Sequence, residues 1–314
     1  MKAIVCNRSN KSKLMTMQEI DKPVPTEDEV LVKVHASSIN AADYRSVRYG
    51  IKARNNVYGA DVAGVVETVG KNITRLKAGD RVFGDILSAG FGGFAEFATA
   101  PERLLARIPD TVSFTDAASL PIAAITALQG LRNYKKLNAG SQVLIVGAGG
   151  GVGTFAMQIA NFFDTEITAV CGPKNVELIR SLGADRVVDY SHEDFTQIEK
   201  RFDLLMAING TQKIGTYRRL LKPDGYLIMV GGGLSQLISL MATNWLYTGS
   251  RKKMVLLNAR PSVEDLETLA QWVAEGKLKP VIDRVVPFAE TPQAFNYMNT
   301  GHARGKVIVK IVEE

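Results

Sequence analysis

The sequence contains very little cysteine and histidine. Its 314 residues include two cysteines, Cys6 and Cys171, and three histidines, His35, His192 and His302. All five are isolated along the chain, and no CxxC pair is present. Because zinc sites are built mainly from Cys and His ligands, the sequence predicts no metal site. The isolated thiols also exclude a CxxC redox motif, and we expect them to be reduced.

Long apolar runs and polybasic arms are lacking as well. No stretch approaches the about 18 apolar residues that cross a bilayer, and Met1 leads directly into a predicted strand rather than a targeting segment. We therefore expect a cytoplasmic protein without an integral membrane segment. Lys and Arg exceed Asp and Glu, 38 against 32, and the net charge is +6. Because these cations are scattered, we attribute the excess to solvated surface and to an anionic cofactor, and expect no nucleic-acid partner.

Two families of catalytic motif are absent. None of the nine tyrosines has a lysine four positions later, which excludes the Tyr-x-x-x-Lys pair of short-chain dehydrogenases. No G-x-S-x-G sequence is present, which argues against an α/β-hydrolase. Hydride transfer without a metal remains, and it suits acceptors that are already electrophilic, such as quinones or activated enones.

The pattern of predicted strands and helices changes twice along the chain. Residues 1–100 are rich in short alternating strands and Gly/Pro turns, which predicts a compact β-barrel-like unit. From Ser141 onward apolar strands alternate with helices, which indicates a doubly wound parallel sheet. After about residue 260, a capped helix over 262–275 precedes two more strands, over 281–288 and 306–312. We expect this tail to rejoin the N-terminal unit, so that the parallel sheet is an insertion.

The most informative motif is a glycine cluster between a strand and a helix. Val143–Val146 reads as an apolar strand, and the helix begins within 147–153, where Gly147, Gly150 and Gly153 recur at every third position. Such spacing permits a tight turn, close approach of the backbone to a pyrophosphate and close helix–strand packing. The free N–H groups at the helix start then hold the phosphates. The cluster therefore predicts a dinucleotide-binding site.

The end of the second strand of this domain favours NADPH over NADH. NAD enzymes place an acid there for the ribose 2′-hydroxyl, but 170–175 contains none, and Glu166 lies at the opposite end of the strand. Lys174 is placed to meet a 2′-phosphate. The alternative is that Lys174 is an ordinary exposed loop lysine.

Together these features resemble the zinc-free quinone oxidoreductase family of the medium-chain dehydrogenases/reductases. The resemblance covers nearly the whole chain and is carried by the segments 40–43, 59–66, 79–82, 120–121, 126–127, 147–153, 183–185, 189–190 and 305–309. It implies an α/β protein with a GroES-like β-barrel catalytic domain formed by 1–119 and 259–314. A Rossmann domain over 120–258 would bind NADPH, and the substrate cleft would lie between the two.

The resemblance also implies roles for individual residues. Asn40 and Thr126 would lie beside the nicotinamide, and Lys174 and Tyr190 would contact the 2′-phosphate. Further cofactor contacts would come from Gly147, Gly150, Gly151, Val152, Gly153, Asn209, Gly210, Val230 and Gly231. Asn40 and Tyr44 are the candidate catalytic residues. Where some relatives carry a tyrosine this chain has Arg45, so that Tyr44, Tyr49 and Tyr58 are open either to orienting the acceptor or to packing.

The resulting hypothesis is an NADPH-dependent, zinc-independent oxidoreductase that transfers hydride to a quinone. An NADPH-dependent alkenal or enone reductase is the alternative with the same cofactor site. A non-catalytic NADPH-binding protein that binds nucleic acid is the alternative of another class. We also expect a homodimer, since an edge strand near 253–258 could pair two parallel sheets.

Overall fold

The structure, a computed structural model, describes residues 1–7, 14–232 and 251–312 of the chain. The chain divides into two compact units. Unit 1 comprises Met1–Ile125 and Pro261–Glu314, and unit 2 comprises Thr126–Arg260. The domain limits predicted from the sequence, 119/120 and 258/259, lie slightly earlier in the chain than these boundaries. Both chain ends therefore belong to one unit, and the other is inserted between them.

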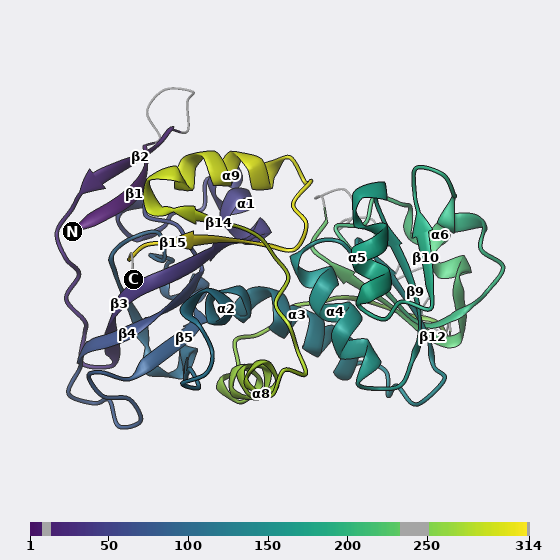
Figure 1. The fold of residues 1–314 in the computed structure, drawn as a ribbon, viewed down its shortest axis with the longest axis horizontal. Helices are drawn as coiled ribbons and strands as arrows, with labels where there is room; N and C mark the ends of the chain where they lie inside the picture. The colour runs from purple at the N-terminus through teal and green to yellow at the C-terminus, as the bar shows by residue number, and fades with distance from the viewer. Residues whose placement is uncertain (8–13, 233–250, 313–314) are drawn as a thin grey trace. The chain divides into compact units, whose positions relative to one another are not determined.

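Unit 1 is built on a seven-stranded sheet (Figure 1). Its strands follow the order β14-β15-β3-β4-β5-β7, and β6 pairs with β3 beside this path. The bounds are β3 Glu29–Ile39, β4 Asp61–Val69, β5 Arg81–Asp85, β6 Phe97–Pro101, β7 Leu105–Arg107, β14 Ile282–Pro287 and β15 Lys306–Lys310. A separate antiparallel pair joins β1, Lys2–Asn7, to β2, Leu14–Glu19.

The pairing of β15 with β3 brings the end of the chain back to its beginning. These strands are antiparallel, with Ile308 opposite Ser38 and Val307 opposite Ile39. Three consecutive residues of β15, Val307 to Val309, are fully buried, because a strand within this sheet packs apolar side chains on both faces. The register also sets the first residue of β15, Lys306, beyond the end of β3, near the start of the following helix.

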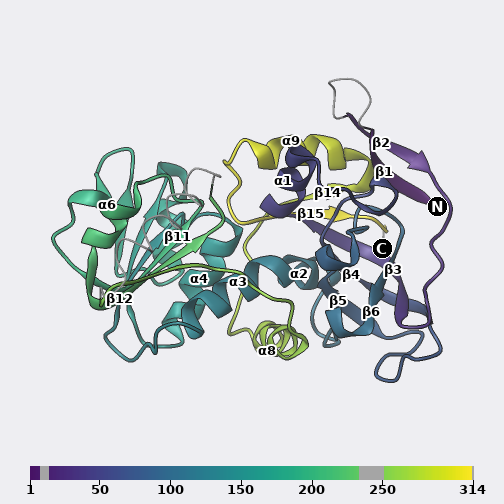
Figure 2. The same ribbon diagram turned by 180° about the vertical axis from the view of Figure 1, so that it is seen from behind.

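The described helices of unit 1 are short, and a polar residue directly precedes each of them. They are α1 Ala41–Tyr49, α2 Phe114–Ser119, α8 Val263–Ala274 and α9 Thr291–Asn299. Ser113 and Ser262 cap α2 and α8, because each side-chain oxygen accepts the backbone N–H of the residue three positions later. The helix predicted over 262–275 is thereby confirmed. Helix α2 packs on β3 and β4, and α1 lies against α9 (Figure 2).

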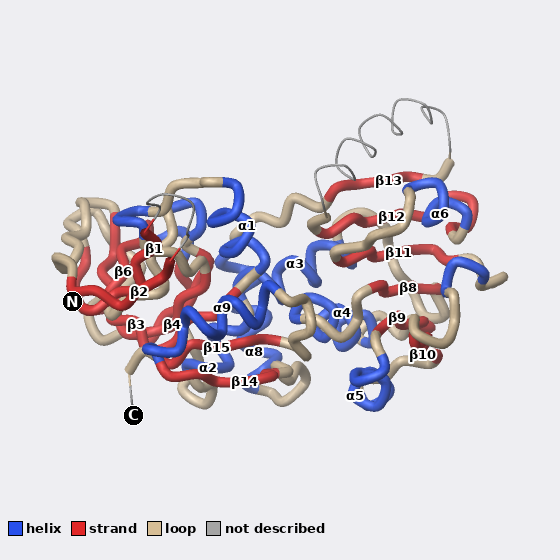
Figure 3. Tube along the Cα trace, turned by 90° about the horizontal axis from the view of Figure 1, so that it is seen from above, coloured by secondary structure: helices blue, strands red, loops and turns tan. Residues whose placement is uncertain are grey.

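Unit 2 is a six-stranded, fully parallel sheet in the order β10-β9-β8-β11-β12-β13 (Figure 3). Its strands are β8 Gln142–Val146, β9 Glu166–Cys171, β10 Arg186–Asp189, β11 Phe202–Ile208, β12 Leu221–Val230 and β13 Lys253–Leu256. The helices are α4 Gly151–Asn161, α5 Val176–Ser181 and α6 Ile214–Arg219, while α3, Pro121–Arg132, spans the unit boundary. Short 3₁₀ turns occur at Arg54–Asn56, Leu87–Ala89, Glu102–Leu104, Pro173–Asn175, Phe195–Gln197 and Phe288–Glu290.

The strand order of unit 2 reverses between β8 and β11. From β8 the chain proceeds outward to β9 and β10, and then returns to the opposite side of β8 to form β11. Connections on the two sides of this point leave a crevice beyond the carboxyl ends of the strands, where ligands of open parallel sheets bind. The fold thus singles out the segments that follow Val146 and Ile208.

Candidate functional site

The glycine cluster follows β8 at the reversal of strand order. Gly147 has a φ of +83°, in the left-handed region that favours glycine. A Cβ added there would lie 2.7 Å from the carbonyl oxygen of Ile208, at the end of β11. A Cβ on Gly153 would lie 2.3 Å from the Gly147 oxygen and 2.5 Å from that of Ala148. These two glycines therefore let the loop turn and bring α4 close to β8.

Gly150 differs from these two, because neither its backbone conformation nor the neighbouring protein atoms require a glycine. It is the N-cap of α4 in extended conformation, with φ −86° and ψ 176°. The nearest atom that an added Cβ would meet is the Gly147 oxygen, at an ordinary 3.7 Å. The N–H groups of the first helical residues, Gly151 and Val152, have no acceptor within the helix. The half-exposed helix start fits the phosphates of a dinucleotide, for which a missing side chain leaves room.

The loop after β9 lies against the glycine cluster, because β9 pairs with β8. The Asn175 side-chain nitrogen is 2.4 Å from where a Cβ of Gly149 would lie. Lys174, one position earlier, is exposed. Tyr190 follows the adjacent strand β10, is 62% exposed, and has its hydroxyl 2.8 Å from a Cβ placed on Gly172. A cation and a phenol thus stand at neighbouring strand ends beside the loop.

The ends of β11 and β12 also meet at this edge of the sheet. The backbone N–H of Asn209 donates to the carbonyl of Val230 over 2.9 Å. Asn209 has a φ of +50°, a conformation that asparagine tolerates better than most residues. Gly210 packs closely against the Tyr217 hydroxyl, and Gly231 follows Val230 with a φ of +65°. The structure therefore brings the predicted residues of 147–153, 172–175, 190, 209–210 and 230–231 to the carboxyl edge of one sheet.

Thr126 and Asn40 lie elsewhere in the chain. Thr126 is within α3 and is 7% exposed. Asn40 belongs to unit 1, precedes α1 and is 6% exposed. Its side-chain amide takes part in a buried network: Nδ2 donates to Asp61 Oδ2 at 2.8 Å, and Oδ1 accepts from Lys306 Nζ at 2.7 Å. The Ser38 hydroxyl donates to the same Asp61 oxygen at 2.6 Å.

Three charged groups of this network are buried. Lys306 is 2% exposed, Asp43 and Asp61 are fully buried, and Lys306 Nζ lies 3.5 Å from Asp61 Oδ2. Burial raises the pKa of Asp43 to about 7, and hydrogen bonds from the Asn40 and Gly59 N–H groups oppose this increase. The Asp43 carboxyl also accepts the Ala60 N–H. Burial likewise raises the pKa of Asp61 and lowers that of Lys306, while each opposes the shift of the other. Their attraction offsets part of the desolvation of both charges.

The three candidate tyrosines have different surroundings. Tyr58 is fully buried and its hydroxyl donates to the Ile51 carbonyl at 2.7 Å, so that it is a core residue. Tyr49 is 61% exposed at the end of α1. Tyr44 is half-buried and lines a cavity of about 340 Å³ in unit 1, together with Met15, Val47, Arg48, Pro292, Phe295, Asn296 and Asn299. Of the three, only Tyr44 lines a described cavity.

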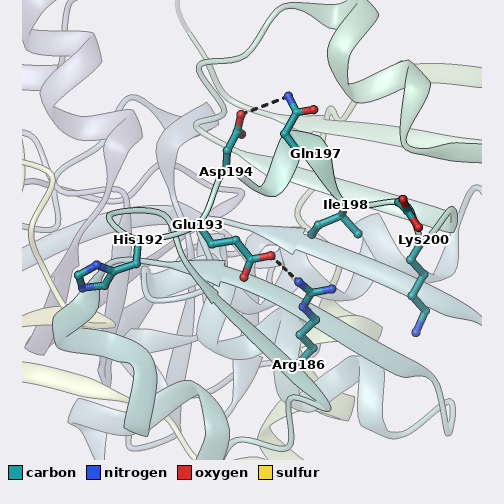
Figure 4. A pocket seen from close by; sticks show the side chains of 8 residues that line it. Arg186, His192, Glu193, Asp194, Gln197, Ile198 and Lys200 are labelled. Carbon is teal, nitrogen blue, oxygen red and sulfur yellow. Dashed lines mark hydrogen bonds and ion pairs between the residues drawn. The ribbon is translucent and has the colours of Figure 1, made fainter.

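A second cavity, of about 520 Å³, lies in unit 2 after β10 (Figure 4). All of its lining residues except Ile198 are charged or polar, with Glu193 paired to Arg186 and Asp194 bonded to Gln197. Ligand pockets are mostly apolar with a few polar groups, and none of the predicted site residues lines this cavity. We therefore do not place the functional site there.

No metal site is evident in the part of the chain that the structure describes. Within it, no group of three or more His, Cys, Asp and Glu side chains could hold a metal ion. Cys6 and Cys171 are buried, and burial raises the pKa of the Cys171 thiol to about 11. His35 stacks on Phe114, and the side chain of His192 is 82% exposed. Among the described helices, none has the length and apolarity needed to cross a bilayer.

Comparison with known proteins identifies the family. The family described as Alcohol dehydrogenase GroES-like domain matches residues 26–110, and that described as Zinc-binding dehydrogenase matches 182–309. The chain is 33% identical to the chloroplast envelope quinone oxidoreductase homolog of Arabidopsis thaliana, over 94% of each chain. It belongs to the quinone oxidoreductases of the medium-chain dehydrogenase/reductase family. The enzyme is also 32% identical to the NADPH-dependent alkenal/one oxidoreductase, chloroplastic, of the same plant, over 91% of this chain and 73% of the relative.

A solved structure supports the same assignment. The quinone oxidoreductase of Coxiella burnetii has 27% identity and a TM-score of 0.90, with 99% of both chains covered. The predicted fold class, a GroES-like domain with a Rossmann parallel sheet, is confirmed. The protein is an oxidoreductase that depends on a nicotinamide cofactor, and the non-catalytic alternative has no support. Although the second family is described as zinc-binding, the His, Cys, Asp and Glu side chains among the described residues form no cluster that fits a zinc ion.

Sequence reasoning gave no role to the buried charges Asp43, Asp61 and Lys306, although all three lie in segments that carried the resemblance. One signal was present. Asp61 and Lys306 each begin a strand and directly precede a run of mostly apolar residues, and a charge that is buried with such a run needs a partner. The sequence could not show which partner, because the two residues are far apart in the chain.

Proposed function

We propose that this enzyme is a zinc-independent NADPH-dependent reductase that transfers hydride to a quinone. The observation that carries the cofactor choice is the pair of strand ends next to the glycine loop. An exposed cation, Lys174, and an exposed phenol, Tyr190, lie there, and the segment 172–175 directly after β9 contains no acid. A 2′-phosphate would be bound by this pair, whereas the segment 172–175 offers no carboxylate to the ribose 2′-hydroxyl of NADH. The alkenal/one oxidoreductase relative also carries NADPH in its name.

The chain supplies binding and orientation, since bound NADPH itself supplies the hydride. The N–H groups of Gly151 and Val152 would hold the pyrophosphate at the positive end of α4. Asn209, Gly210, Val230 and Gly231, at the ends of β11 and β12, would line the nicotinamide, with Thr126. Asn40 is proposed to lie beside the nicotinamide, and Tyr44 to orient the acceptor. Reduction of the acceptor also needs one proton, which we assign to solvent.

An enone or alkenal is the second candidate acceptor. It is favoured by the name of the alkenal/one oxidoreductase of Arabidopsis thaliana, a relative that matches 91% of this chain. Reduction of either acceptor needs the same cofactor site. The two reactions differ only in the protein groups that must surround the reacting carbon or oxygen. Hydride goes to the β-carbon of an enone, and the developing oxyanion is stabilised by hydrogen-bond donors.

The deciding experiment follows NADPH oxidation by the purified protein with a small quinone and, in parallel, with a short 2-alkenal. We expect turnover with the quinone that is unchanged by a metal chelator, because the described residues hold no metal-ligand group. Turnover with the alkenal alone would establish the second candidate. Activity that disappears with the chelator and returns with zinc would contradict the zinc-independent mechanism.

Substitution of Lys174 tests the cofactor choice directly. We expect Lys174→Gln to raise the KM for NADPH roughly 10- to 100-fold, because a charge-assisted contact to the 2′-phosphate is worth about 1.5–3 kcal/mol. The KM for NADH should stay within a factor of about two, since NADH lacks that phosphate. Lys200, an exposed lysine paired with Glu166 at the opposite end of β9, provides a control, and Lys200→Gln should change neither constant. Equal effects on both cofactors would refute this role for Lys174.

Two further properties stay proposals. The strand β13 pairs with β12 and lies at the edge of the sheet, and we propose that its outer edge joins two copies into a homodimer. We also propose a cytoplasmic location. This proposal rests on the sequence alone, since the plant relatives include a chloroplastic protein and give it no support.

A further inference from the structure

The Asn40 amide is held between a cation and an anion. Lys306 Nζ donates to its Oδ1 at 2.7 Å, and its Nδ2 donates to Asp61 Oδ2 at 2.8 Å. An ammonium can only donate hydrogen bonds, and a carboxylate in its ionised form can only accept them. The opposite orientation of the amide would place N–H groups against an ammonium and an oxygen against a carboxylate. These two charges therefore permit a single orientation of Asn40.

The position of Lys306 results from long-range pairing. Lys306 is the first residue of β15, and this strand pairs with β3, which ends just before Asn40. The side chain is 2% exposed and Asp61 is fully buried. Replacing a buried ion pair by apolar residues is often neutral or stabilising. Stability alone thus gives no reason to bury this pair, whereas the fixed orientation of a neighbouring amide does.

The amide keeps only part of its hydrogen-bonding capacity. Besides Asp61, Nδ2 has only long contacts, of 3.4 and 3.3 Å, to the carbonyl and hydroxyl oxygens of Ser38. A bound molecule can therefore compete for the second Nδ2 hydrogen. The orientation imposed by Lys306 decides which face of Asn40 offers a donor to that molecule.

We propose that Lys306 is a positioning residue, which acts on the reaction through the side chain of Asn40. The inference rests on the proposed function, in which Asn40 lies beside the nicotinamide. Lys306 itself contacts neither cofactor nor acceptor in this scheme. It supplies the positive charge of the buried cluster and fixes the amide, so that Asn40 presents the same donor to each incoming molecule.

The test removes the two charges together, as Lys306→Met with Asp61→Asn. Both members of the ion pair are removed together, and Asp43, the buried carboxyl that remains, still accepts the N–H groups of Asn40, Gly59 and Ala60. We therefore expect the melting temperature to stay near that of the wild type. An asparagine at position 61 carries both a donor and an acceptor, so it can hydrogen-bond to the Asn40 amide in either orientation. The orientation of Asn40 is then no longer fixed. We expect kcat to fall roughly 10- to 100-fold, as misplaced catalytic contacts do. The dissociation constant of NADPH should change less than threefold, because the phosphates are bound by unit 2.

A matched control removes an exposed ion pair of the same unit, Lys22→Met with Glu67→Gln, and should leave kcat unchanged. Should the first variant not fold, Lys306→Gln with Asp61→Asn keeps a polar side chain at both positions and carries the same expectation. A folded variant with wild-type kcat overturns the positioning role and leaves the proposed function standing. Absence of wild-type turnover overturns the proposed function, and this inference with it. Failure of both variants to fold would show that the pair serves the fold, which also overturns the inference.

Discussion

Gly153→Ala should destabilise unit 2 by roughly 3 kcal/mol, although alanine is the better helix former by about 1 kcal/mol. The reason is steric, since the new Cβ would lie 2.3 and 2.5 Å from two backbone oxygens of the glycine loop. Backbone cannot move aside as a side chain can, so α4 must shift away from β8. Urea denaturation followed by circular dichroism measures the change in the free energy of unfolding.

The same exchange at Gly215 provides the control. This glycine lies in α6 of the same unit, and a Cβ there meets no atom within 4 Å. We expect Gly215→Ala to stabilise unit 2 by up to about 1 kcal/mol, because alanine restricts the unfolded chain. If both substitutions changed stability equally, close packing of α4 on β8 could not be the reason for Gly153.

Local patterns were sufficient to predict most of unit 2. The strand predicted over Val143–Val146 lies within β8, and α4 follows it through the predicted glycine cluster. Apolar strands that are covered on both faces carry a strong signal, and their carboxyl ends must lie at one edge of a parallel sheet. Because the candidate residues follow such strands, their gathering at this edge could be anticipated from order along the chain.

In unit 1, local sequence patterns could not predict the contacts of the buried polar residues. The network of Asn40, Asp61 and Lys306 depends on the register between β3 and β15, which joins residues 266 positions apart in the chain. No local period specifies that register, and hydrogen-bond partners cannot be inferred without it. Tyr58 is a similar case. Its sequence neighbourhood left a role at the acceptor open, but complete burial and a bond to the Ile51 carbonyl make it a core residue.

Gly150→Val should leave the enzyme folded but weaken NADPH binding by about 100-fold or more, equivalent to about 2.7 kcal/mol. The extended backbone at Gly150 suits valine, and the nearest protein atom to the new Cβ is 3.7 Å away. Only a modest cost, of about 1 kcal/mol, is expected from the poorer N-cap. The isopropyl group would instead enter the space that the proposed pyrophosphate site requires, in front of the N–H groups of Gly151 and Val152.

Thermal unfolding with and without NADPH distinguishes these effects. At 100 times its dissociation constant a ligand stabilises the native state by about 2.7 kcal/mol, so the wild type should melt at a higher temperature with NADPH. Gly150→Val should show almost no such increase, while its melting temperature without cofactor stays near the wild-type value. Gly215→Val, a valine placed in open space at another helix start, should retain the full increase. A normal response of Gly150→Val to NADPH would mean that the phosphates do not approach the start of α4. The cofactor site would then have to be sought away from the glycine loop, although the loop has the conformation that such a site requires.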